Sequence, residues 1–102
     1  MTRPVVWSRS ALDDLKGQLI RIAEDDPAAA QRVAQTLGST AQALGGIPTG
    51  RPGHVAGTYE KLVSRLPYII AYALPRSEGE PVAILRVIHT ARHWPSGGWP
   101  ED

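Results

Sequence analysis

Residues 68–89 read YIIAYALPRSEGEPVAILRVIH, two apolar runs on either side of a polar segment. The first run, 68–74, is apolar on both faces when side chains alternate, which is typical of a strand inside a sheet. Pro75 and Gly79 belong to the polar segment and indicate a turn. The second run, 82–89, is rich in valine and isoleucine and predicts another interior strand. This part of the chain therefore indicates a pair of strands at the centre of a sheet.

Two further strands are expected outside this pair. Residues 58–64 read TYEKLVS and predict a strand with one face partly exposed, with Pro67 marking the turn that follows. Near the N-terminus, residues 4–7 read PVVW, a short apolar run that we interpret as a strand. Glycines and prolines punctuate residues 45–57 and indicate a loop before the strands.

A helix is expected directly after the N-terminal strand. Ser8 and Ser10 are good N-caps, and Asp13 and Asp14 suit the positive end of the helix dipole. Apolar side chains then recur at spacings of three and four, which predicts one buried face and a helix that extends to about Glu24. The residues expected on this face are Leu12, Leu15, Leu19 and Ile22.

A second helix is expected to begin at once. Asp26 is a natural N-cap before Pro27, because proline suits the first helical position. The expected buried stripe is formed by Ala30, Val33, Leu37, Ala41 and Leu44. Gly45, Gly46 and Pro48 end the helix. Because so short a connection joins the helices, they should form an antiparallel hairpin.

The order of elements predicts an α+β fold. An N-terminal strand is followed by an antiparallel helical hairpin, which packs on one face of a mainly antiparallel sheet, in the order β-α-α-β-β-β. A chain of 102 residues suffices for one domain. We expect this domain to span residues 1–95, with a flexible C-terminal tail over 96–102.

Composition narrows the functional classes. The chain has no cysteine, which excludes disulfides, thiolate metal sites and cysteine nucleophiles. No apolar run approaches 18 residues and no signal peptide is recognisable, so we expect no membrane contact and a cytoplasmic location. The net charge is +1, but the segment 51–95 holds six lysines and arginines against three glutamates, together with all three histidines. This local basic excess points weakly to an acidic or nucleic-acid partner.

One group of side chains has the chemistry of a metal-independent ribonuclease. Arg86, His89, Arg92 and His93 lie close together in sequence and are considered with Arg51. Histidine can transfer protons near neutral pH, and arginine can stabilise a phosphorane. The same residues serve equally well as contacts within the fold or with a partner, and both interpretations stay open here. No metal or cofactor is expected, because His89 and His93 would share a face only in a helix, whereas His89 ends an expected strand and His93 lies just before Pro95.

Trp94 and Trp99 have two interpretations as well. A tryptophan after the last strand is typical of a plug that closes the edge of the core. Tryptophan is also enriched where partners bind, so Trp94 is a candidate anchor for another protein.

Taken together, several segments resemble the RelE/ParE toxin superfamily. The stretch 7–15, WSRSALDDL, is similar to the opening of ParE-type toxins, and 26–30, DPAAA, is similar to the start of their second helix. Further matching segments follow in the family's order: GRPG at 50–53, GTYE at 57–60, PYIIAY at 67–72 and ILRVIHTARHWP at 84–95. The resemblance covers nearly the whole chain, from Trp7 to Pro95.

The resemblance implies a toxin of a type II toxin–antitoxin system, closer to the ParE branch. RelE-like members cut messenger RNA at the ribosome, whereas ParE-like members poison DNA gyrase. After the last expected strand, the sequence predicts no C-terminal helix of the kind typical of RelE-like nucleases. The first hypothesis is therefore a non-enzymatic gyrase poison, whose candidate target contacts are Arg51, Arg86, Arg92 and Trp94. The alternative is an mRNA endonuclease, whose candidate catalytic residues are Arg51, Arg86, His89 and His93. A third hypothesis is a pairing module that has lost its toxicity.

The resemblance also implies a cognate antitoxin. We expect a small protein with a DNA-binding N-terminal half and a C-terminal segment that folds on the toxin, giving a hetero-oligomer. The helical hairpin and an open sheet edge would offer an apolar groove for that segment. The sequence does not indicate which residues contact the antitoxin.

Overall fold

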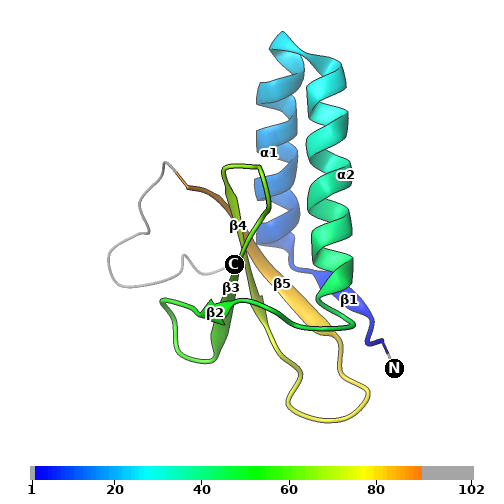
Figure 1. Ribbon diagram of the computed structural model, residues 1–102, viewed down its shortest axis with the longest axis vertical. Helices are drawn as coiled ribbons and strands as arrows, with labels where there is room; N and C mark the ends of the chain where they lie inside the picture. The colour runs from blue at the N-terminus through cyan, green and yellow to red at the C-terminus, as the bar shows by residue number, and fades with distance from the viewer. Residues whose placement is uncertain (1, 91–102) are drawn as a thin grey trace.

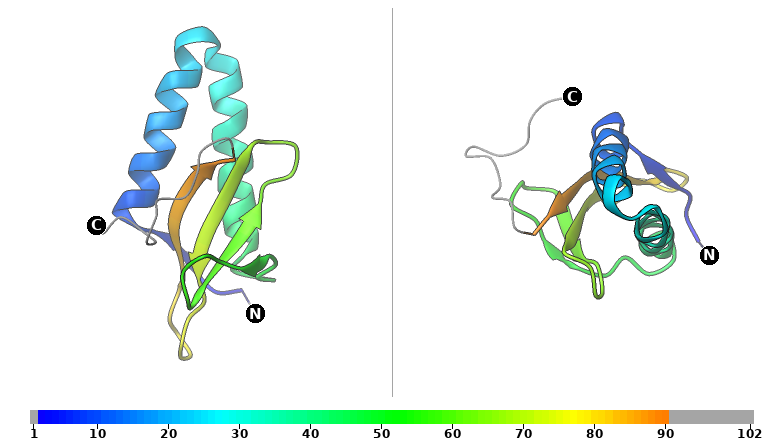
Figure 2. Two further views of the ribbon diagram at one scale, coloured as in Figure 1. Left: turned by 90° about the vertical axis from the view of Figure 1, so that its left-hand side faces the viewer. Right: turned by 90° about the horizontal axis from the view of Figure 1, so that it is seen from above.

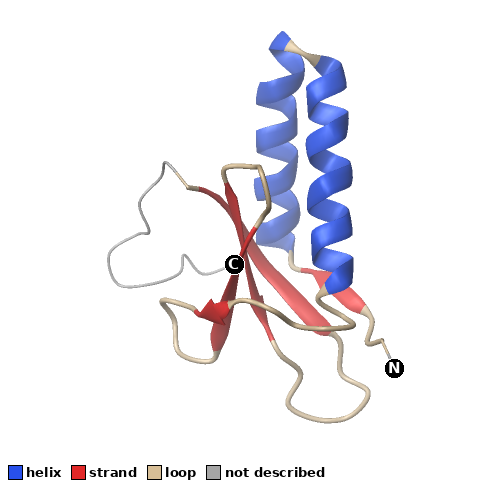
Figure 3. Cartoon of the chain, in the orientation of Figure 1, coloured by secondary structure: helices blue, strands red, loops and turns tan. Residues whose placement is uncertain are grey.

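The computed structural model describes residues 2–90, which form two helices and a five-stranded sheet (Figure 1). The elements are β1 Val5–Trp7, α1 Arg9–Asp25, α2 Pro27–Ala43, β2 Arg51–Pro52, β3 Thr58–Leu62, β4 Tyr68–Ala73 and β5 Val82–His89. Both helices stand on one side of the sheet and extend well beyond it (Figures 2 and 3). This arrangement confirms the α+β fold. The expected tail, 96–102, and the expected end of the domain at residue 95 lie outside the described residues.

The strands follow the order β1-β5-β4-β3-β2 across the sheet. β1 pairs with β5 in parallel, and every other pair is antiparallel. β4 and β5 are thus interior strands, as their apolar sequences predict. The sheet differs from the expected one by β2, a two-residue strand opposite Tyr59 and Glu60. Two residues are too few to show an alternating pattern, so the sequence carries no signal for this strand.

The helical hairpin depends on its capping residues. The Ser8 hydroxyl accepts a hydrogen bond from the Ala11 backbone amide at 3.0 Å and begins α1. The Asp26 carboxylate accepts one from the Ala29 amide at 3.1 Å and begins α2. The Asp26 amide also donates to the Ile22 carbonyl at the end of α1, at 2.9 Å. One residue therefore ends the first helix and begins the second, as expected, which makes the two helices antiparallel.

The core lies between the hairpin and the covered face of the sheet. All five side chains expected on the α2 stripe are buried there: Ala30, Val33, Leu37, Ala41 and Leu44. Val33, Leu37, Ala41 and Leu44 pack with residues of β4 and β5, chiefly Tyr68, Ile70, Tyr72, Val82, Ile84 and Val87.

The expectation for α1 is wrong at one position. Leu12 is 41% exposed, whereas its neighbour Ala11 is fully buried. Ser8 donates its amide to the Ile84 carbonyl and its hydroxyl to the Leu85 carbonyl, which holds the first turn of α1 against β5. The small Ala11 side chain fits this close contact. One residue further on, the helix has turned by about 100°, and Leu12 points away.

The two leucines provide a matched test of this core. We expect Leu37→Ala to lower the free energy of unfolding by about 2–5 kcal/mol, because Leu37 is fully buried and its truncation leaves a cavity. We expect Leu12→Ala to change it by about 0.5 kcal/mol or less, because a largely exposed side chain loses few contacts. Urea denaturation of both variants measures the difference. Equal destabilisation would contradict the described orientation of α1.

Candidate functional site

The face of the sheet away from the helices carries three charged residues in one row. Residues that pair across neighbouring strands lie on the same face. Arg51 pairs with Glu60, Glu60 with Ala71, and Ala71 with Arg86, so these four residues form one line across β2, β3, β4 and β5. We call this line the cross-strand row. It places two of the sequence-predicted residues, Arg51 and Arg86, on one face, at opposite ends.

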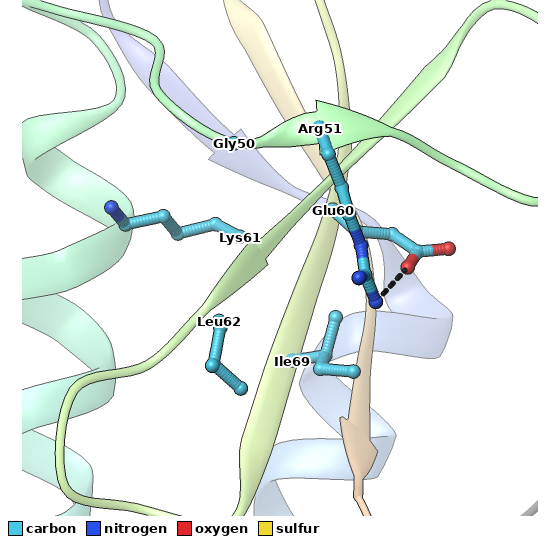
Figure 4. A pocket seen from close by; sticks show the side chains of 6 residues that line it. All are labelled: Gly50, Arg51, Glu60, Lys61, Leu62 and Ile69. Carbon is cyan, nitrogen blue, oxygen red and sulfur yellow. Dashed lines mark ion pairs between the residues drawn. The ribbon is translucent and has the colours of Figure 1, made fainter.

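Near the β2 end of this row, Glu60 is the residue that the neighbouring side chains contact. Its side chain is only 2% exposed, and its carboxylate has two partners from the β2 side. The His54 ring nitrogen Nδ1 lies 2.7 Å from Oε2, and the His54 backbone amide donates to the same oxygen at 3.1 Å. An Arg51 terminal nitrogen lies 3.5 Å from Oε1 (Figure 4). A buried carboxylate is therefore satisfied by two side chains that are themselves more than half exposed.

Close backbone contacts hold these partners in place. Gly50 has a φ of +134°, and a Cβ atom there would lie 2.5 Å from the Glu60 carbonyl oxygen, so only glycine fits. The Tyr72 hydroxyl donates to the Thr49 carbonyl at 2.6 Å and fixes the chain just before Gly50. On the far side, the Gly53 amide donates to the Thr58 carbonyl at 2.8 Å. β2 is therefore held at both ends against β3.

The electrostatics of Glu60 follow from this geometry. Burial acts to raise the pKa of the Glu60 carboxyl. The hydrogen bonds from the His54 side chain and amide, with the charges of His54 and Arg51, outweigh burial and hold that pKa below its usual value. Glu60 is therefore ionised at neutral pH and neutralises part of the basic charge around it.

Arg86, at the other end of the row, belongs to the fold. Its Nε and a terminal nitrogen donate to the two carboxylate oxygens of Asp14 at 2.7 and 2.9 Å, and the Val87 amide donates to Asp14 as well, at 2.9 Å. This contact changes the expected roles of Asp14 and Arg86. Asp14 binds β5 and does not serve the helix dipole, because α1 begins at Arg9 and Asp14 lies in its second turn. The guanidinium of Arg86 is occupied by a two-fold contact that joins α1 to β5.

His89 lies on the covered face. It pairs with Tyr68, and the two rings meet edge to face with centroids 5.3 Å apart. Tyr68 is buried in the core and donates a hydrogen bond to Gln18 of α1, so His89 faces the helices. Arg51 and Arg86 are three strand spacings apart, about 14 Å. The structure thus does not bring Arg51, Arg86 and His89 together. Arg92, His93 and Trp94 lie outside the described residues.

The exposed part of the row is suited to binding. A cavity of about 260 Å³ is lined by Gly50, Arg51, Glu60, Lys61, Leu62 and Ile69. The Arg51 side chain, 72% exposed, extends past Glu60 toward Leu62 and Ile69, while Lys61 extends to the left of the view, away from them (Figure 4). The site thus combines an accessible guanidinium with two aliphatic side chains. Within residues 2–90, no three histidine or carboxylate side chains gather where they could hold a metal ion.

The sequence did not single out Glu60. A glutamate within a partly exposed strand looks like an ordinary surface residue, and so does a histidine in the loop before that strand. The available signal was the spacing of His54 and Glu60 around Gly57, whose positive φ of 83° permits a reversal of the chain. That reversal brings the two side chains together.

Comparison with known proteins identifies relatives over most of the chain. The family model described as "ParE toxin of type II toxin-antitoxin system, parDE" matches residues 5–94. A Sinorhizobium fredii (strain NBRC 101917 / NGR234) protein named "Putative toxin Y4kP" is 39% identical over 90 residues, which cover 87% of this chain and 90% of the relative.

Two solved structures have a similar fold. A chain of the chromosomal ParDE toxin–antitoxin system from P. aeruginosa superposes with a TM-score of 0.77 at 22% identity, covering 86% of this chain and 96% of that one. A chain of the toxin–antitoxin complex RelBE2 from Mycobacterium tuberculosis superposes with a TM-score of 0.55 at 23% identity, covering 90% and 95%. No helix within residues 2–90 is long and apolar enough to cross a membrane.

The carboxylate of Glu60 makes stability depend on pH. Because its pKa is lower in the folded than in the unfolded chain, its stabilising effect is present above the usual glutamate pKa and is lost as pH falls through the folded-state value. We expect the wild-type chain to lose stability below about pH 5 more steeply than Glu60→Gln. Thermal unfolding at pH values from 7 to 3 measures this difference. Parallel curves would contradict a stabilising role for the ionised carboxylate.

Proposed function

Because this chain belongs to the ParE toxin family of type II toxin–antitoxin systems, we propose that it stops growth by binding DNA gyrase and stabilising the enzyme's DNA-cleaved state. A cognate antitoxin neutralises it by direct binding. In this proposal the toxin makes no chemical change in its target, and its action depends on a binding surface alone.

The arrangement of the basic side chains is the observation that carries this proposal. A metal-independent ribonuclease needs an acid–base pair and phosphate-binding cations around one reacting group. Among the described residues, Arg86 is held by Asp14, His89 faces the helices, and Arg51 lies at the far edge of the sheet. Side chains so placed do not converge on one phosphate. They leave a surface for binding.

Arg51 is the target contact that the described residues support best. Its side chain is 72% exposed, and its ion pair with Glu60, at 3.5 Å, is longer than a strong hydrogen bond. Arginine is enriched among the interface residues whose truncation costs the most binding energy. Arg92 and Trp94 complete the proposed contact set. Arg86 is better assigned to the fold.

Labelled precursors distinguish gyrase inhibition from RNA cleavage. We expect induction of the chain in a bacterial host to lower thymidine incorporation within the first minutes, while methionine incorporation continues, because gyrase is needed for replication. An early fall in methionine incorporation would overturn the proposal and favour the endonuclease. Normal incorporation of both precursors, with normal growth, would indicate the non-toxic pairing module.

The role of Arg51 is tested with purified gyrase. We expect Arg51→Ala to need about tenfold more protein than wild type to accumulate cleaved DNA, because truncating a central interface arginine costs more than about 1 kcal/mol. Arg65→Ala, at an exposed arginine in the β3–β4 turn, is the matched control and should act like wild type. Equal potency of the two variants would remove Arg51 from the contact surface.

A further inference from the structure

The two carboxylate oxygens of Glu60 have different partners. Oε2 accepts a hydrogen bond from the His54 amide at 3.1 Å and lies 2.7 Å from the ring nitrogen Nδ1. Because an ionised carboxylate only accepts, Nδ1 donates to it. Oε1 has the Arg51 guanidinium as its ion-pair partner, at 3.5 Å. His54 thus fixes the orientation of the carboxylate, and this orientation directs the second oxygen at Arg51.

Burial of Glu60 makes its contact with Arg51 persistent. An ion pair between two exposed side chains is weak, because water solvates each charge almost as well as the partner does. The Glu60 side chain is only 2% exposed, so water cannot readily take the place of its partners. The carboxylate therefore retains a cation at Oε1, and among residues 2–90 that cation is Arg51.

The backbone of β2 does not by itself determine where the guanidinium lies. Hydrogen bonds and close contacts hold the chain before and after Arg51. Several rotatable bonds nevertheless separate this backbone from the guanidinium, and the side chain is 72% exposed. A long, exposed side chain samples many rotamers, and ordering it when a partner binds costs free energy. Figure 4 shows that the guanidinium lies beside the Glu60 carboxylate, which restricts this sampling.

The contact with Glu60 also leaves Arg51 available to a partner. The terminal nitrogen of Arg51 that pairs with Glu60 lies 3.5 Å from Oε1, which is longer than a strong hydrogen bond. A guanidinium has five N–H donors, and this side chain is mostly exposed, so donors remain for another group. Arg86 is the opposite case, since two of its nitrogens donate to Asp14 and its side chain is only 23% exposed. Asp14 therefore occupies its arginine, whereas Glu60 orients one.

We propose that Glu60 is a positioning residue for Arg51: its carboxylate, aligned by His54, sets the direction of the Arg51 guanidinium on the face of the sheet away from the helices and leaves that group available to the target. The inference rests on the proposed function, because it takes Arg51 to be a target contact. It goes beyond that function by assigning a role in target recognition to Glu60 and His54, neither of which is among the proposed contacts.

The motion of Arg51 in the free chain tests the positioning directly. Glu60→Gln keeps the size of the side chain and removes its charge. His54→Ala removes the ring that donates to Oε2, and His54→Asn keeps a donor close to the position of Nδ1. Nitrogen-15 relaxation of the Arg51 Nε–H group measures the motion in each full-length variant. We expect more motion than in wild type for Glu60→Gln and His54→Ala, and motion close to wild type for His54→Asn.

Two controls separate the side chain of Arg51 from the backbone of β2. The Nε–H group of Arg65, which is exposed in the β3–β4 turn, should move equally in every variant. The Gly53 amide, which donates to the Thr58 carbonyl, should stay protected from hydrogen exchange. Loss of this protection in both Glu60→Gln and His54→Ala would overturn the inference, because the pair would then hold the backbone of β2. Unchanged motion of Arg51 in both variants would overturn it as well.

Purified gyrase tests the consequence for recognition. We expect Glu60→Gln to need about three- to fivefold more protein than wild type to accumulate cleaved DNA, because the ordering of one long side chain is then left to the binding step. In an Arg51→Ala background, the same change should alter potency by less than about twofold, because a positioning residue acts only through the group that it positions. Glu78→Gln, in the exposed loop between β4 and β5, is the matched control and should act like wild type.

Other results with gyrase overturn the inference. If Glu60→Gln lowers potency by the same factor with and without Arg51, Glu60 acts through stability or overall charge. If Glu60→Gln raises potency, the carboxylate holds Arg51 back from the target. If Arg51→Ala is as potent as wild type, the contact and the role of Glu60 in recognition are both wrong, although gyrase poisoning by the wild-type chain would still support the proposed function. If the wild-type chain accumulates no cleaved DNA, the proposed function itself is wrong.

Discussion

The outer edge of β5 is the constraint on which the rest of the structure depends. β1 covers only the part of that edge that pairs with Val82–Ile84. Beyond it, Ser8 binds the carbonyls of Ile84 and Leu85, and Asp14 accepts the Val87 amide and holds the Arg86 guanidinium. Ser8, which caps α1, and Asp14, in its second turn, therefore bind the backbone groups of β5 that β1 does not reach. This attachment fixes the angle of the hairpin over the sheet, and with it the covered face.

This attachment also gives Arg86 and Arg51 different surroundings. Asp14 lies at the edge of β5, where it accepts hydrogen bonds from the Val87 amide and the Arg86 guanidinium. Arg86 therefore joins β5 to α1. Arg51, three strands away, meets a carboxylate that already has His54 as its closer partner. Of these two arginines of the sheet, only Arg51 is largely exposed, and it lies beside Leu62 and the cavity at β2 and β3. The side of the sheet at β1 and β5 is thus joined to α1, and the side at β2 and β3 keeps Arg51 exposed.

Local sequence patterns predicted most helices and strands, but they did not predict contacts between residues far apart in the sequence. Asp26 before Pro27 predicts a cap within three residues, and the structure places it as expected. The Asp14–Arg86 pair joins residues 72 apart in sequence, and no periodicity links two such positions. Spacing also misplaced Leu12, because the hydrogen bonds of Ser8 set the rotation of α1 and turn Ala11 to the sheet. Glu60 looks like a surface residue in sequence, and only the return of the chain after Gly57 explains its burial.

The single-residue connection at Asp26 has a consequence for the order of folding. Two helices joined so closely meet through contacts that are local in sequence, which form fast. The bond between the Ser8 hydroxyl and the Leu85 carbonyl spans 77 residues, and such contacts form more slowly because the entropy lost on closing a loop rises with its length. We therefore expect the hairpin to form early and the parallel pairing of β1 with β5 to form late. Until that step, the edge of β5 is open to any strand that reaches it first.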